Sequence, residues 1–544
     1  MAASLHTSVI IIGGSIVGLS SALFLAAQRV PFVLLERHQT SSPHPRAIGW
    51  TYRTMELFRS VGLDSAIPVP KEGPRGGKPR RVTTKTLNGE WSEEIHWTKP
   101  NTDEAGSNDA GAARRGSPLS AGTGSFSPVC DAGLAQDELE PIIRNRVLEM
   151  GGDLRLGCTV VSWSQSEDSV SVTATKADGT EFTVDGEYLI ACDGARSGVR
   201  KDLGIGGHGV GYLRTLRSIL FRCPSIDHYL SRGIHQWSIK NDDIEAFLVT
   251  YSDGRWALMS YDAAQDALDE DGQKAYIQKA IGEKLTDIQL LSQGKWDLSA
   301  TVADSFSSGR VFLAGDAAHA LPPSRGGWGA NTGIADVHNL AWKLAAVLSR
   351  TSKPSLLETY DAERRPVALV RHDQIFARDD YKAFAEGSDW AKNSGPVAVI
   401  GDVAMELGQL YRSTAVLGSE DGDLPDARTP AQWAGQPGTR APHVPLKRPG
   451  DDSGISTLDL FGQGWVVLSE DSKWRSPEYR FIQIGQDVLE AERGTFAKAF
   501  GLENASGAAL VRPDGYIAAR WPSAPESPLE AARDTFARVS HSTL

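Results

Sequence analysis

The chain has 544 residues, of which 40% are hydrophobic and 23% are charged, as is typical of globular proteins. Its formal net charge of −12, without any run of Lys or Arg, argues against a nucleic-acid-binding surface. The four cysteines are far apart and form no CxxC pair, which argues against a zinc site or a disulfide framework and fits a reducing, cytoplasmic location. We also expect no transmembrane segment and no metal site.

The chain begins with a dinucleotide-binding pattern. A buried strand over 8–12 precedes Gly-Gly-Ser-Ile-Val-Gly, which opens a helix. Gly13 makes the tight turn, and Gly18 allows close packing of the helix. Ser15 replaces the usual middle glycine of GxGxxG, and a pyrophosphate can still approach if this side chain turns away.

A second strand over 31–35 ends in Glu36. A carboxylate at this position can accept hydrogen bonds from both hydroxyls of a ribose, and it repels a 2′-phosphate, so NADP is not the expected ligand here. Arg46 follows in a loop before a short helix, where it can contact the cofactor. Residues 68–130 are rich in Gly, Pro, Ser and charge and predict strands over 81–87 and 93–97 and a long loop, before a helix that starts near Gln136.

Short alternating strands over 153–192, with a hairpin at Lys-Ala-Asp-Gly-Thr, end in Asp193 and Gly194. Residues 205–300 are rich in strands and aromatic residues, and they predict a sheet whose inward-facing residues form the floor of a substrate pocket. The candidate floor residues are Tyr212, Arg217, His235, Trp237, Phe247, Tyr251 and Trp256.

The stretch 309–348 predicts a short strand, then Gly315-Asp316, then a loop rich in Pro and Gly, then a long amphipathic helix. We interpret Asp316 as an acceptor for a sugar-like hydroxyl. The amides of Gly329, Ala330 and Asn331 lie at the predicted helix start, where unpaired donors and the positive end of the helix dipole favour negative charge. A second long helix follows, then a linker rich in Pro, Gly and Asp, then alternating strands and helices that predict a separate small domain.

These motifs, in this order, resemble the class A FAD-dependent aromatic hydroxylases, which are flavoprotein monooxygenases. The similarity is strongest to the branch that acts on polyketides and polycyclic phenols, such as the aklavinone hydroxylases. It extends over nearly the whole chain and includes GGWGANTGIADVHNLAWKLA, TYDAERRPVA and GAALVRPDGYIAARW. The resemblance implies an α/β fold with a Rossmann-like FAD-binding domain, an inserted β-sheet substrate domain and a C-terminal thioredoxin-like domain that lacks the redox CxxC.

The domain boundaries that we predict are 1–72, 128–200 and 298–412 for FAD binding, 73–127 and 201–297 for the substrate sheet, 413–448 for the linker and 449–544 for the C-terminal domain. The resemblance also implies the FAD-binding residues. They are Gly13, Ser15, Ile16, Gly18, Glu36, Arg37, Arg46, Gln136, Asp193, Asp316, Pro323, Gly329, Ala330 and Asn331. In this assignment Glu36 binds the adenosine ribose, Asp316 the ribityl chain, and 329–331 the flavin ring, while Asp193 belongs to a motif implicated in both FAD and NAD(P)H binding.

The family's chemistry implies that NADPH or NADH reduces FAD, that O2 forms a flavin C4a-hydroperoxide, and that this species hydroxylates an electron-rich aromatic carbon. No second βαβ fingerprint exists for NAD(P)H, so we expect it to dock transiently. The candidate catalytic or pocket residues are His235, Tyr251, Trp237 and Trp328.

Baeyer–Villiger oxidation or epoxidation on the same fold remains an alternative, as does a non-catalytic flavin-binding protein. A flavin-dependent halogenase is disfavoured because its WxWxIP motif is absent. The chain alone does not distinguish a monomer from a homodimer, and it does not identify the aromatic substrate.

Overall fold

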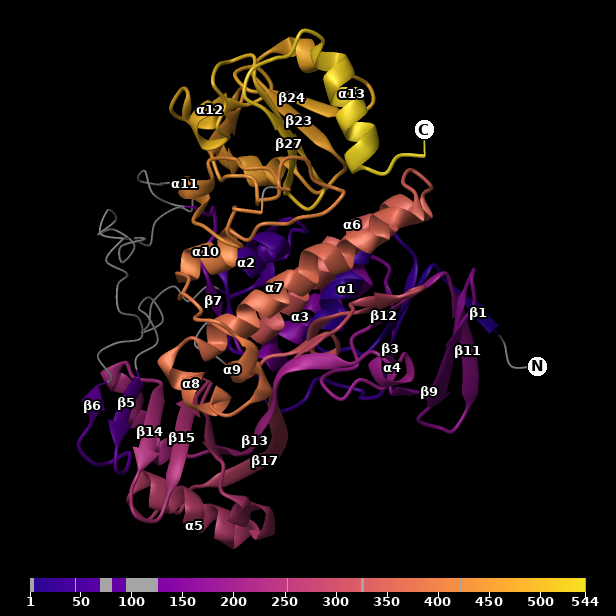
Figure 1. The fold of residues 1–544 in the computed structure, drawn as a ribbon. Coiled ribbons are helices and arrows are strands. Elements are labelled where there is room, and N and C mark those ends of the chain that lie inside the picture. Colours follow the sequence, from indigo (N-terminus) through magenta and orange to yellow (C-terminus); the bar gives the residue numbers. More distant parts are fainter. Residues whose placement is uncertain are drawn as a thin grey trace.

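The computed structural model describes residues 4–44, 46–68, 81–93, 126–251, 253–323, 327–420 and 422–543. The fold is mixed α/β, with a parallel sheet, a large and mostly antiparallel sheet, and a C-terminal part that contains its own sheets (Figure 1). In the part of the chain so described, no helix is long and apolar enough to cross a membrane.

The parallel sheet has the strand order β18-β19-β12-β2-β3-β8, and only the β18–β19 pair is antiparallel. Its strands are β2 (Val9–Ile12), β3 (Phe32–Glu36), β8 (Asp153–Leu156), β12 (Tyr188–Ala191), β18 (Ser307–Ser308) and β19 (Val311–Leu313). Every residue of β2, β12 and β19 is buried, as expected for a parallel sheet that is covered on both faces.

Helices pack around this sheet. They are α1 (Ile16–Ala27), α2 (Tyr52–Arg59), α3 (Gln136–Glu149), α4 (Gly198–Asp202), α6 (Trp328–Leu348) and α7 (Glu358–Phe376). α6 packs against α1, and a Cβ added at Gly333 would come within 2.6 Å of Val17 and 2.9 Å of Gly315. A glycine at this position therefore lets the long helix approach both the first helix and the loop after β19.

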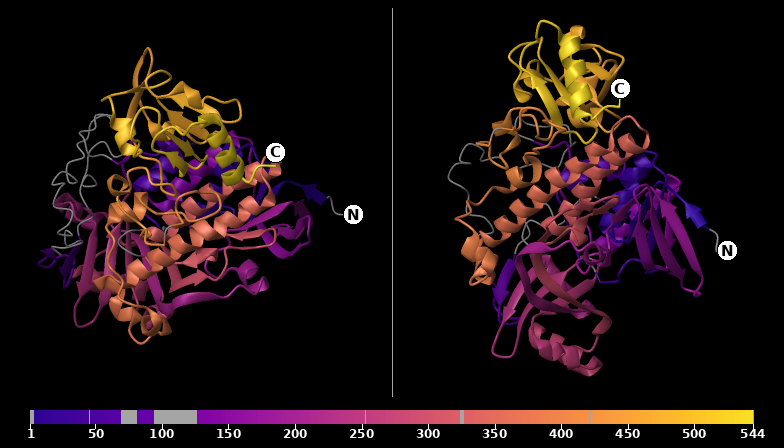
Figure 2. Two further views of the ribbon diagram at one scale, coloured as in Figure 1. Left: turned by 45° about the horizontal axis from the view of Figure 1, so that its top comes forward. Right: turned by 45° about the vertical axis from the view of Figure 1, so that its right-hand side comes forward.

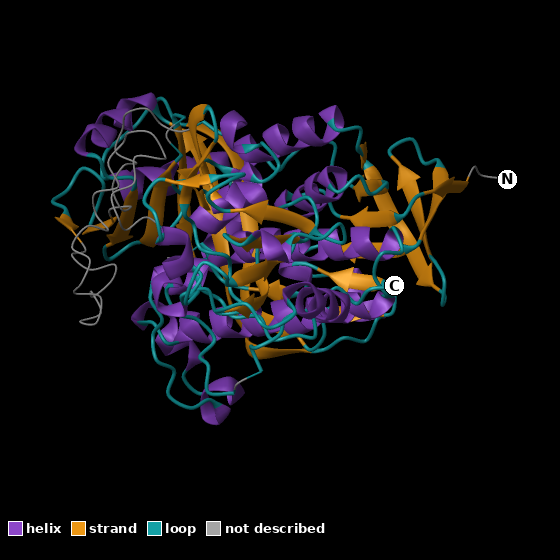
Figure 3. Cartoon of the chain, turned by 90° about the horizontal axis from the view of Figure 1, so that it is seen from above, coloured by secondary structure: helices purple, strands orange, loops and turns teal. Residues whose placement is uncertain are grey.

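A small side sheet lies near the N-terminal end of the molecule, as Figures 1 and 3 show. It has the order β1-β11-β10-β9, and its strands are β1 (Ser4–His6), β9 (Cys158–Gln165), β10 (Val170–Lys176) and β11 (Glu181–Gly186). The antiparallel β10–β11 pair confirms the predicted hairpin. A short antiparallel pair, β4 (Gly49–Trp50) with β7 (Ala132–Gly133), joins two loops beside the parallel sheet.

The large sheet has the order β20-β17-β13-β16-β15-β14-β5-β6. Its strands are β5 (Arg81–Thr84), β6 (Ser92–Glu93), β13 (Gly207–Arg222), β14 (Gln236–Lys240), β15 (Glu245–Thr250), β16 (Arg255–Ser260), β17 (Gln289–Ala303) and β20 (His319–Ala320). The predicted strand over 81–87 is shorter than expected, and most of the strand predicted over 93–97 falls outside the described residues.

Helix α5 (Glu270–Ile281) covers one face of this sheet. Ile277 of α5 belongs to the same buried cluster as Trp237 and Trp256. On the opposite face, Leu220 and Tyr251 share a cluster with Ala135, which directly precedes α3. The sheet therefore turns one face to α5 and the other to the parallel-sheet part of the molecule.

The chain then continues through α8 (Asp379–Ala385), α9 (Asp389–Asn393) and α10 (Asp402–Leu407) into the C-terminal part. This part and the sheet covered by α5 lie at opposite ends of the molecule, with α6 and α7 between them (Figures 1 and 2). Its main sheet has the order β24-β23-β26-β27. The remaining elements are α11 (Pro430–Trp433), β21 (Pro445–Arg448), β22 (Asp451–Ser456), β23 (Val466–Ser469), β24 (Arg480–Gln483), β25 (Leu489–Glu490), α12 (Thr495–Ala499), β26 (Ala508–Val511), β27 (Ile517–Trp521) and α13 (Pro528–Val539).

The predicted linker 413–448 does not extend to its expected end. Its last four residues form β21, which pairs with β22 and β25. Arg440 is buried and forms an ion pair with Glu56 of α2. Pro- and Gly-rich composition indicated a linker, but a buried charge pair with a distant helix holds this segment against the fold.

Buried charges also join the C-terminal part to α6 and α7. Arg512 donates to both carboxylate oxygens of Glu363, at 2.5 and 2.8 Å, and also pairs with Asp514. Lys343 of α6 reaches Glu363 at 2.8 Å. The side chains of Arg512, Glu363 and Lys343 are 0% exposed, so these charges are neutralised by one another rather than by water.

Replacing Arg512 with Met should destabilise the protein by about 3–5 kcal/mol, because Glu363 and Asp514 would keep buried charge without their main partner. The midpoint of urea unfolding, followed by circular dichroism, measures this effect. Lys392→Ala is the control, since the Lys392–Asp389 pair is 64% and 93% exposed and should contribute less than about 1 kcal/mol. Equal midpoints for the two variants would contradict the assigned role of Arg512.

Candidate functional site

Four neighbouring parallel strands end in residues suited to cofactor binding. Along the carboxyl edge of β19, β12, β2 and β3 lie, in that order, Asp316, Asp193, the glycine loop at 13–15, and Glu36. Neighbouring strands are about 4.8 Å apart, so these four points span about 14 Å. The edge therefore presents an extended row of polar groups, as an elongated ligand requires.

Glycine is required in the loop between β2 and α1. Gly13 has a φ of +102°, and a Cβ there would lie 2.3 Å from the carbonyl oxygen of Cys192. A Cβ at Gly18 would lie 1.8 Å from the carbonyl oxygen of Gly13. The loop is therefore packed tightly against β12 and α1, with the buried Ile16 as the first residue of the helix.

Ser15 meets the condition under which it can replace a glycine. Its hydroxyl donates to Glu140 at 2.9 Å and accepts from Nε2 of Gln136 at 2.9 Å, so it is held by other side chains. The Gln136 backbone N–H also donates to the carbonyl of Ala47. Glu140 was not predicted; its position at i+4 from Gln136 on α3 is the sequence feature that could have identified it.

Glu36 points toward the glycine loop. One carboxylate oxygen accepts from the Gly14 N–H at 2.6 Å, and the other accepts from the His38 N–H at 2.8 Å. Arg37 is exposed, and its Nε donates to the ring of His38 at 3.1 Å. The Glu36 carboxylate is thus fixed in orientation and retains lone pairs for further donors.

One of the two carboxylate oxygens of Asp193 accepts a hydrogen bond within the protein. Oδ2 accepts from the Val199 N–H at the start of α4, at 3.2 Å. Oδ1 is buried and has no hydrogen-bond partner within the described ranges. Buried polar atoms are normally paired, so this oxygen is suited to a donor supplied by a ligand.

Asp316 follows Gly315, whose φ of +59° lies in the left-handed region. The carboxyl group is accessible at its surface, yet the protein atoms around it raise its pKa by burial, and the charges of His319 and Arg46 oppose that rise. The structure therefore brings Arg46 close enough to Asp316 for its charge to act on the carboxyl group, although the two residues are far apart in the sequence.

Helix α6 begins at Trp328, after Gly327 with a φ of +61°. Gly329 and Ala330 are partly exposed in its first turn and retain N–H groups without an intrahelical partner. The side chain of Asn331 is buried and serves another purpose. Its amide accepts from Thr51 N–H and from the Thr54 hydroxyl, and donates to the carbonyls of Gly49 and Gly327.

The side chain of Asn331 thus connects the β4 turn to the start of α6. The prediction for residue 331 concerned its backbone amide and stays a prediction. Pro323, at the other side of the same loop, is exposed, and its carbonyl accepts from the Tyr381 hydroxyl at 2.5 Å.

Asp336 was missed by the sequence analysis. It is fully buried on α6 and accepts from Nε2 of His319 at 2.6 Å, from the Gly315 N–H at 3.3 Å and from Nε of Arg364 at 2.8 Å. Its position within the predicted amphipathic helix was visible, but its pairing with the Gly315–His319 loop depends on the packing of α6.

Two of the predicted pocket residues, Trp237 and Trp328, lie in the hydrophobic core. Trp237 is 0% exposed and stacks near Trp256, with ring centroids 5.4 Å apart, on the face covered by α5. Trp328 is 1% exposed and packs with Ile375 and Phe376 of α7, beneath the guanidinium of Arg378. Both are core residues, because strand alternation and the turn of α6 direct these large side chains inward.

The other floor candidates divide between the two faces. Phe247 and Tyr251 lie on the face that contacts Ala135. His235 is two residues before Trp237, so strand alternation assigns it to the α5 side. Burial raises the pKa of the Tyr251 phenol well above 10, despite the opposing charge of Arg255, so this hydroxyl stays protonated near neutral pH and is unsuited as a general base.

Two further candidates, Tyr212 and Arg217, belong to β13. Tyr212 is 64% exposed. Arg217 forms an ion pair with Asp266 at 2.7 Å, and its side chain does not lie on the face opposite α5. The described part of the chain holds no group of three or more His, Cys, Asp or Glu residues that could bind a metal ion.

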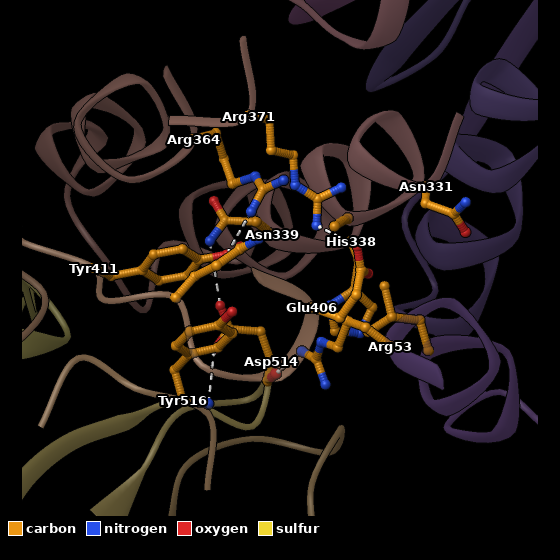
Figure 4. A pocket seen from close by; sticks show the side chains of 13 residues that line it. Arg53, Asn331, His338, Asn339, Arg364, Arg371, Glu406, Tyr411, Asp514 and Tyr516 are labelled. Carbon is orange, nitrogen blue, oxygen red and sulfur yellow. Dashed lines mark hydrogen bonds and ion pairs between the residues drawn. The ribbon is translucent and has the colours of Figure 1, made fainter. Parts of the chain in front are cut away.

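A separate small cavity lies between α2, α6, α7, α10 and the C-terminal part (Figure 4). Asn331, His338 and Asn339 line it from one face of α6, whereas Asp336 is directed to the opposite side, toward Gly315. The cavity is thus separated from the row of acids by α6 itself. Burial, with a further contribution from Arg53, lowers the pKa of the His338 imidazole to about 3.

The low pKa of His338 predicts a pH-dependent stability. Between about pH 6.5 and pH 3 the unfolded chain binds a proton at this residue and the folded chain does not, so stability is lost as the pH falls, by up to about 1.4 kcal/mol per pH unit. His338→Asn should reduce the difference between urea midpoints at pH 7 and pH 5, whereas His228→Asn, at an exposed imidazole, should not. An unchanged pH dependence in His338→Asn would contradict this assignment.

The row of acids and the glycine loop fit FAD. The loop can be approached by a pyrophosphate, Glu36 is oriented toward it, Asp193 has an unpaired buried oxygen, and Asp316 is accessible beside Arg46. These residues are spread over four strand ends, which suits a ligand with several polar groups along its length.

Comparisons with known proteins agree with this geometry. Residues 6–373 match an FAD-binding domain family, and residues 434–539 match the C-terminal domain of aromatic-ring hydroxylases. The chain is 36% identical to 4-methyl-5-nitrocatechol 5-monooxygenase of a Burkholderia species, with 98% of each chain covered. It is 32% identical to aklavinone 12-hydroxylase RdmE of Streptomyces purpurascens, with 98% of this chain and 99% of the relative covered.

Among solved structures, a ternary complex of aklavinone-11 hydroxylase with FAD and aklavinone matches with a TM-score of 0.82 and 30% identity, covering 98% of this chain and 99% of the other. The monooxygenase PieE, in complex with FAD and substrate, matches with a TM-score of 0.80 and 27% identity, and 99% of each chain is covered. The chain therefore belongs to the FAD-dependent aromatic-ring hydroxylases and is a flavin-dependent monooxygenase.

Proposed function

We propose that this protein uses FAD, NAD(P)H and O2 to hydroxylate a phenolic or polycyclic aromatic substrate. The observation that carries the proposal is the row of Asp316, Asp193, the glycine loop and Glu36 along one sheet edge, next to a sheet face that bears Phe247 and Tyr251. The names of its relatives support the substrate class, since they act on a nitrocatechol or on polyketides.

In this proposal Glu36 binds the ribose of the adenosine, and Gly13, Ser15, Ile16 and Gly18 lie against the pyrophosphate. Asp316 accepts a hydrogen bond from the ribityl chain, and Asp193 Oδ1 accepts another donor of the cofactor. Ser15 supports this placement because its hydroxyl is held by Glu140 and Gln136, away from the loop backbone.

When bound, FAD would accept electrons from NAD(P)H and activate O2, which is chemistry that no side chain can provide. The N–H groups of Gly329 and Ala330, at the positive end of the α6 dipole, stabilise negative charge on the flavin ring. The sheet face around Tyr251 and the residues of α3 exclude water from the reaction. Tyr251 donates a hydrogen bond rather than accepting a proton, in keeping with its raised pKa.

We further propose that NAD(P)H docks transiently and that the C-terminal part, which we predict to be thioredoxin-like, has no redox role. No cysteine occurs after Cys223 in the chain. The buried pairs of Arg512 with Glu363 and Asp514 support a structural role for this part instead.

The purified protein should be yellow, and NAD(P)H oxidation should accelerate by about tenfold or more when a suitable phenol is added. Absorbance spectra and the rate of loss at 340 nm measure these two properties, and mass spectrometry should show one added oxygen atom in the product. A yellow protein whose NAD(P)H oxidation no aromatic compound in a broad panel alters would contradict the hydroxylase function.

Asp316→Ala should weaken FAD retention by about tenfold or more, because it removes a charged hydrogen-bond acceptor from the cofactor. Flavin content after gel filtration and the Kd for FAD of the apoprotein measure the loss. Asp168→Ala is a matched control, since the Asp168 side chain is 100% exposed and far along the sequence from the strand ends. Equal flavin content in both variants would refute the role of Asp316.

A further inference from the structure

Three guanidinium groups and one imidazole line the small cavity between α2, α6, α7, α10 and the C-terminal part, as Figure 4 shows. These groups belong to Arg53, Arg364, Arg371 and His338. The cavity lies on the side of α6 away from the Gly315 loop, so it is separate from the row of acids at the sheet edge. A small cavity with polar walls is normally filled by water or by an ion, whereas a cavity that stays empty is normally apolar.

The charges around Glu56 of α2 do not balance. Its carboxylate accepts two hydrogen bonds from the guanidinium of Arg440 and a third, at 3.1 Å, from Nη1 of Arg53. Glu56 and Arg440 are buried, and Arg53 is nearly so. The other hydrogen bond of Arg53 is to a neutral group, the carbonyl of Asp514 at 3.2 Å. One buried carboxylate thus serves two cations, and the excess positive charge belongs mainly to Arg53, which makes the single contact.

The other charged groups of the cavity wall each have a charged partner. The pairs are Arg371–Glu406 at 3.2 Å, Arg364–Asp336 at 2.8 Å and Asp514–Arg512 at 2.5 Å. In the part of the chain that the structure describes, the wall therefore carries an excess of positive charge through Arg53. Because burial of a charge without a counter-ion is costly, a compensating negative charge would stabilise this region.

The cavity wall also holds hydrogen-bond donors without a partner. Nε of Arg371 is buried, and no described residue accepts a hydrogen bond from it. The ring of His338 packs edge-on against Phe24, with ring centroids 4.8 Å apart, and neither ring nitrogen is hydrogen bonded within the described segments. Its low pKa keeps the His338 ring neutral, so that one nitrogen carries an N–H. N–H groups beside a fixed positive charge favour an anion.

We propose that this cavity binds one small monovalent anion, such as chloride, between the Arg53 guanidinium and the N–H groups of Arg371 and His338. The anion supplies the negative charge that Glu56 alone does not provide for two cations. The small size of the cavity excludes a nucleotide, a phosphate ester and an aromatic acid, whereas a halide has the right size and charge. This site lies outside the proposed FAD and substrate sites, so it goes beyond the proposed function and does not depend on it.

Binding at this site connects separate parts of the chain. Arg53 belongs to α2, His338 to α6 and Arg371 to α7, and Asp514 and Tyr516 of the C-terminal part complete the wall. The complete wall exists only when these elements are packed together, so the anion binds the folded chain and not the unfolded one. It therefore stabilises the packing of the C-terminal part against the helices by mass action.

Thermal unfolding of the protein as purified tests the proposal, with sodium gluconate exchanged for sodium chloride at constant ionic strength. Gluconate is also monovalent but is too large for the cavity. We expect the midpoint to rise with chloride as for one binding site, by about 1 °C for each tenfold increase above the Kd. A midpoint that does not depend on chloride would overturn the proposal and would identify the occupant as water.

Arg53→Met should remove the chloride dependence, because Glu56 is then paired with Arg440 alone and the charges balance. Arg59→Met is a matched control on the same helix, since Arg59 pairs with Asp459 at 2.8 Å and does not line the cavity. This variant should keep the chloride dependence of the unmodified protein. Equal chloride dependence in the two variants would contradict the assigned site.

A second pair of variants places the negative charge in the protein itself. His338→Glu should have a midpoint that is insensitive to chloride, because its carboxylate takes the place of the anion. His338→Gln, which is similar in size but neutral, should remain sensitive. If His338→Glu responds to chloride as strongly as His338→Gln, the proposal is wrong.

Diffraction from crystals of the unmodified protein soaked in sodium bromide locates the anion directly and needs no variant. We expect an anomalous difference peak in the cavity, in contact with Arg53 and His338. No peak there, in crystals whose surface sites are labelled by bromide, would also overturn the proposal. None of these measurements uses NAD(P)H or an aromatic substrate, so their outcome can be separated from a failure of the hydroxylase function.

Discussion

The buried carboxylate of Asp336 connects the elements on which the site depends. It accepts from the loop after β19, through Gly315 and His319, and from Arg364 of α7. Because a buried charge must be paired and hydrogen-bonded, these three partners fix the position of α6 relative to both neighbours. The opposing charges of His319 and Arg364 outweigh the effect of burial and lower the pKa of Asp336. Asp316 and the first turn of α6 are positioned by this arrangement.

The same set of charges extends to the C-terminal part. Arg364 donates to the Tyr411 hydroxyl at 2.8 Å, and Tyr411 stacks on Tyr516 with ring centroids 4.0 Å apart. Arg512 and Glu363 form a second connection one residue away from Arg364 along α7. The C-terminal part is thus joined to α6 and α7 by buried side-chain contacts.

The two faces of the large sheet pack against different parts of the molecule. The tryptophans Trp237 and Trp256 pack against α5, where their size contributes to the hydrophobic core. The other face carries smaller apolar side chains in its centre and polar ones toward β5, and it contacts the residues before α3. A one-residue change of register would exchange these two sets, so the pairing of β14 with β15 and β5 determines which residues lie on the face opposite α5.

The sequence by itself determined the βαβ unit, the acids at the strand ends and the hairpin. These features depend on local patterns, because an apolar run that ends in glycine or in an acid predicts the end of a strand wherever it occurs in the sequence. Glu36, Asp193 and Asp316 could be identified for that reason. Their order along one sheet edge required the tertiary structure, because strand order depends on how the crossovers pack.

Only the tertiary structure decided which side chains are buried in the core and which ones pair with distant elements. We predicted Trp237 as an inward-facing residue of the sheet and Trp328 as a pocket residue beside the flavin, but both lie in the core. The side chain of Asn331 binds backbone groups of a loop that is 280 residues earlier in the chain, and Asp336 pairs with partners on other elements. The Pro- and Gly-rich segment around Arg440 is held by a buried partner on α2. Such roles depend on long-range packing and burial, which composition and spacing do not encode.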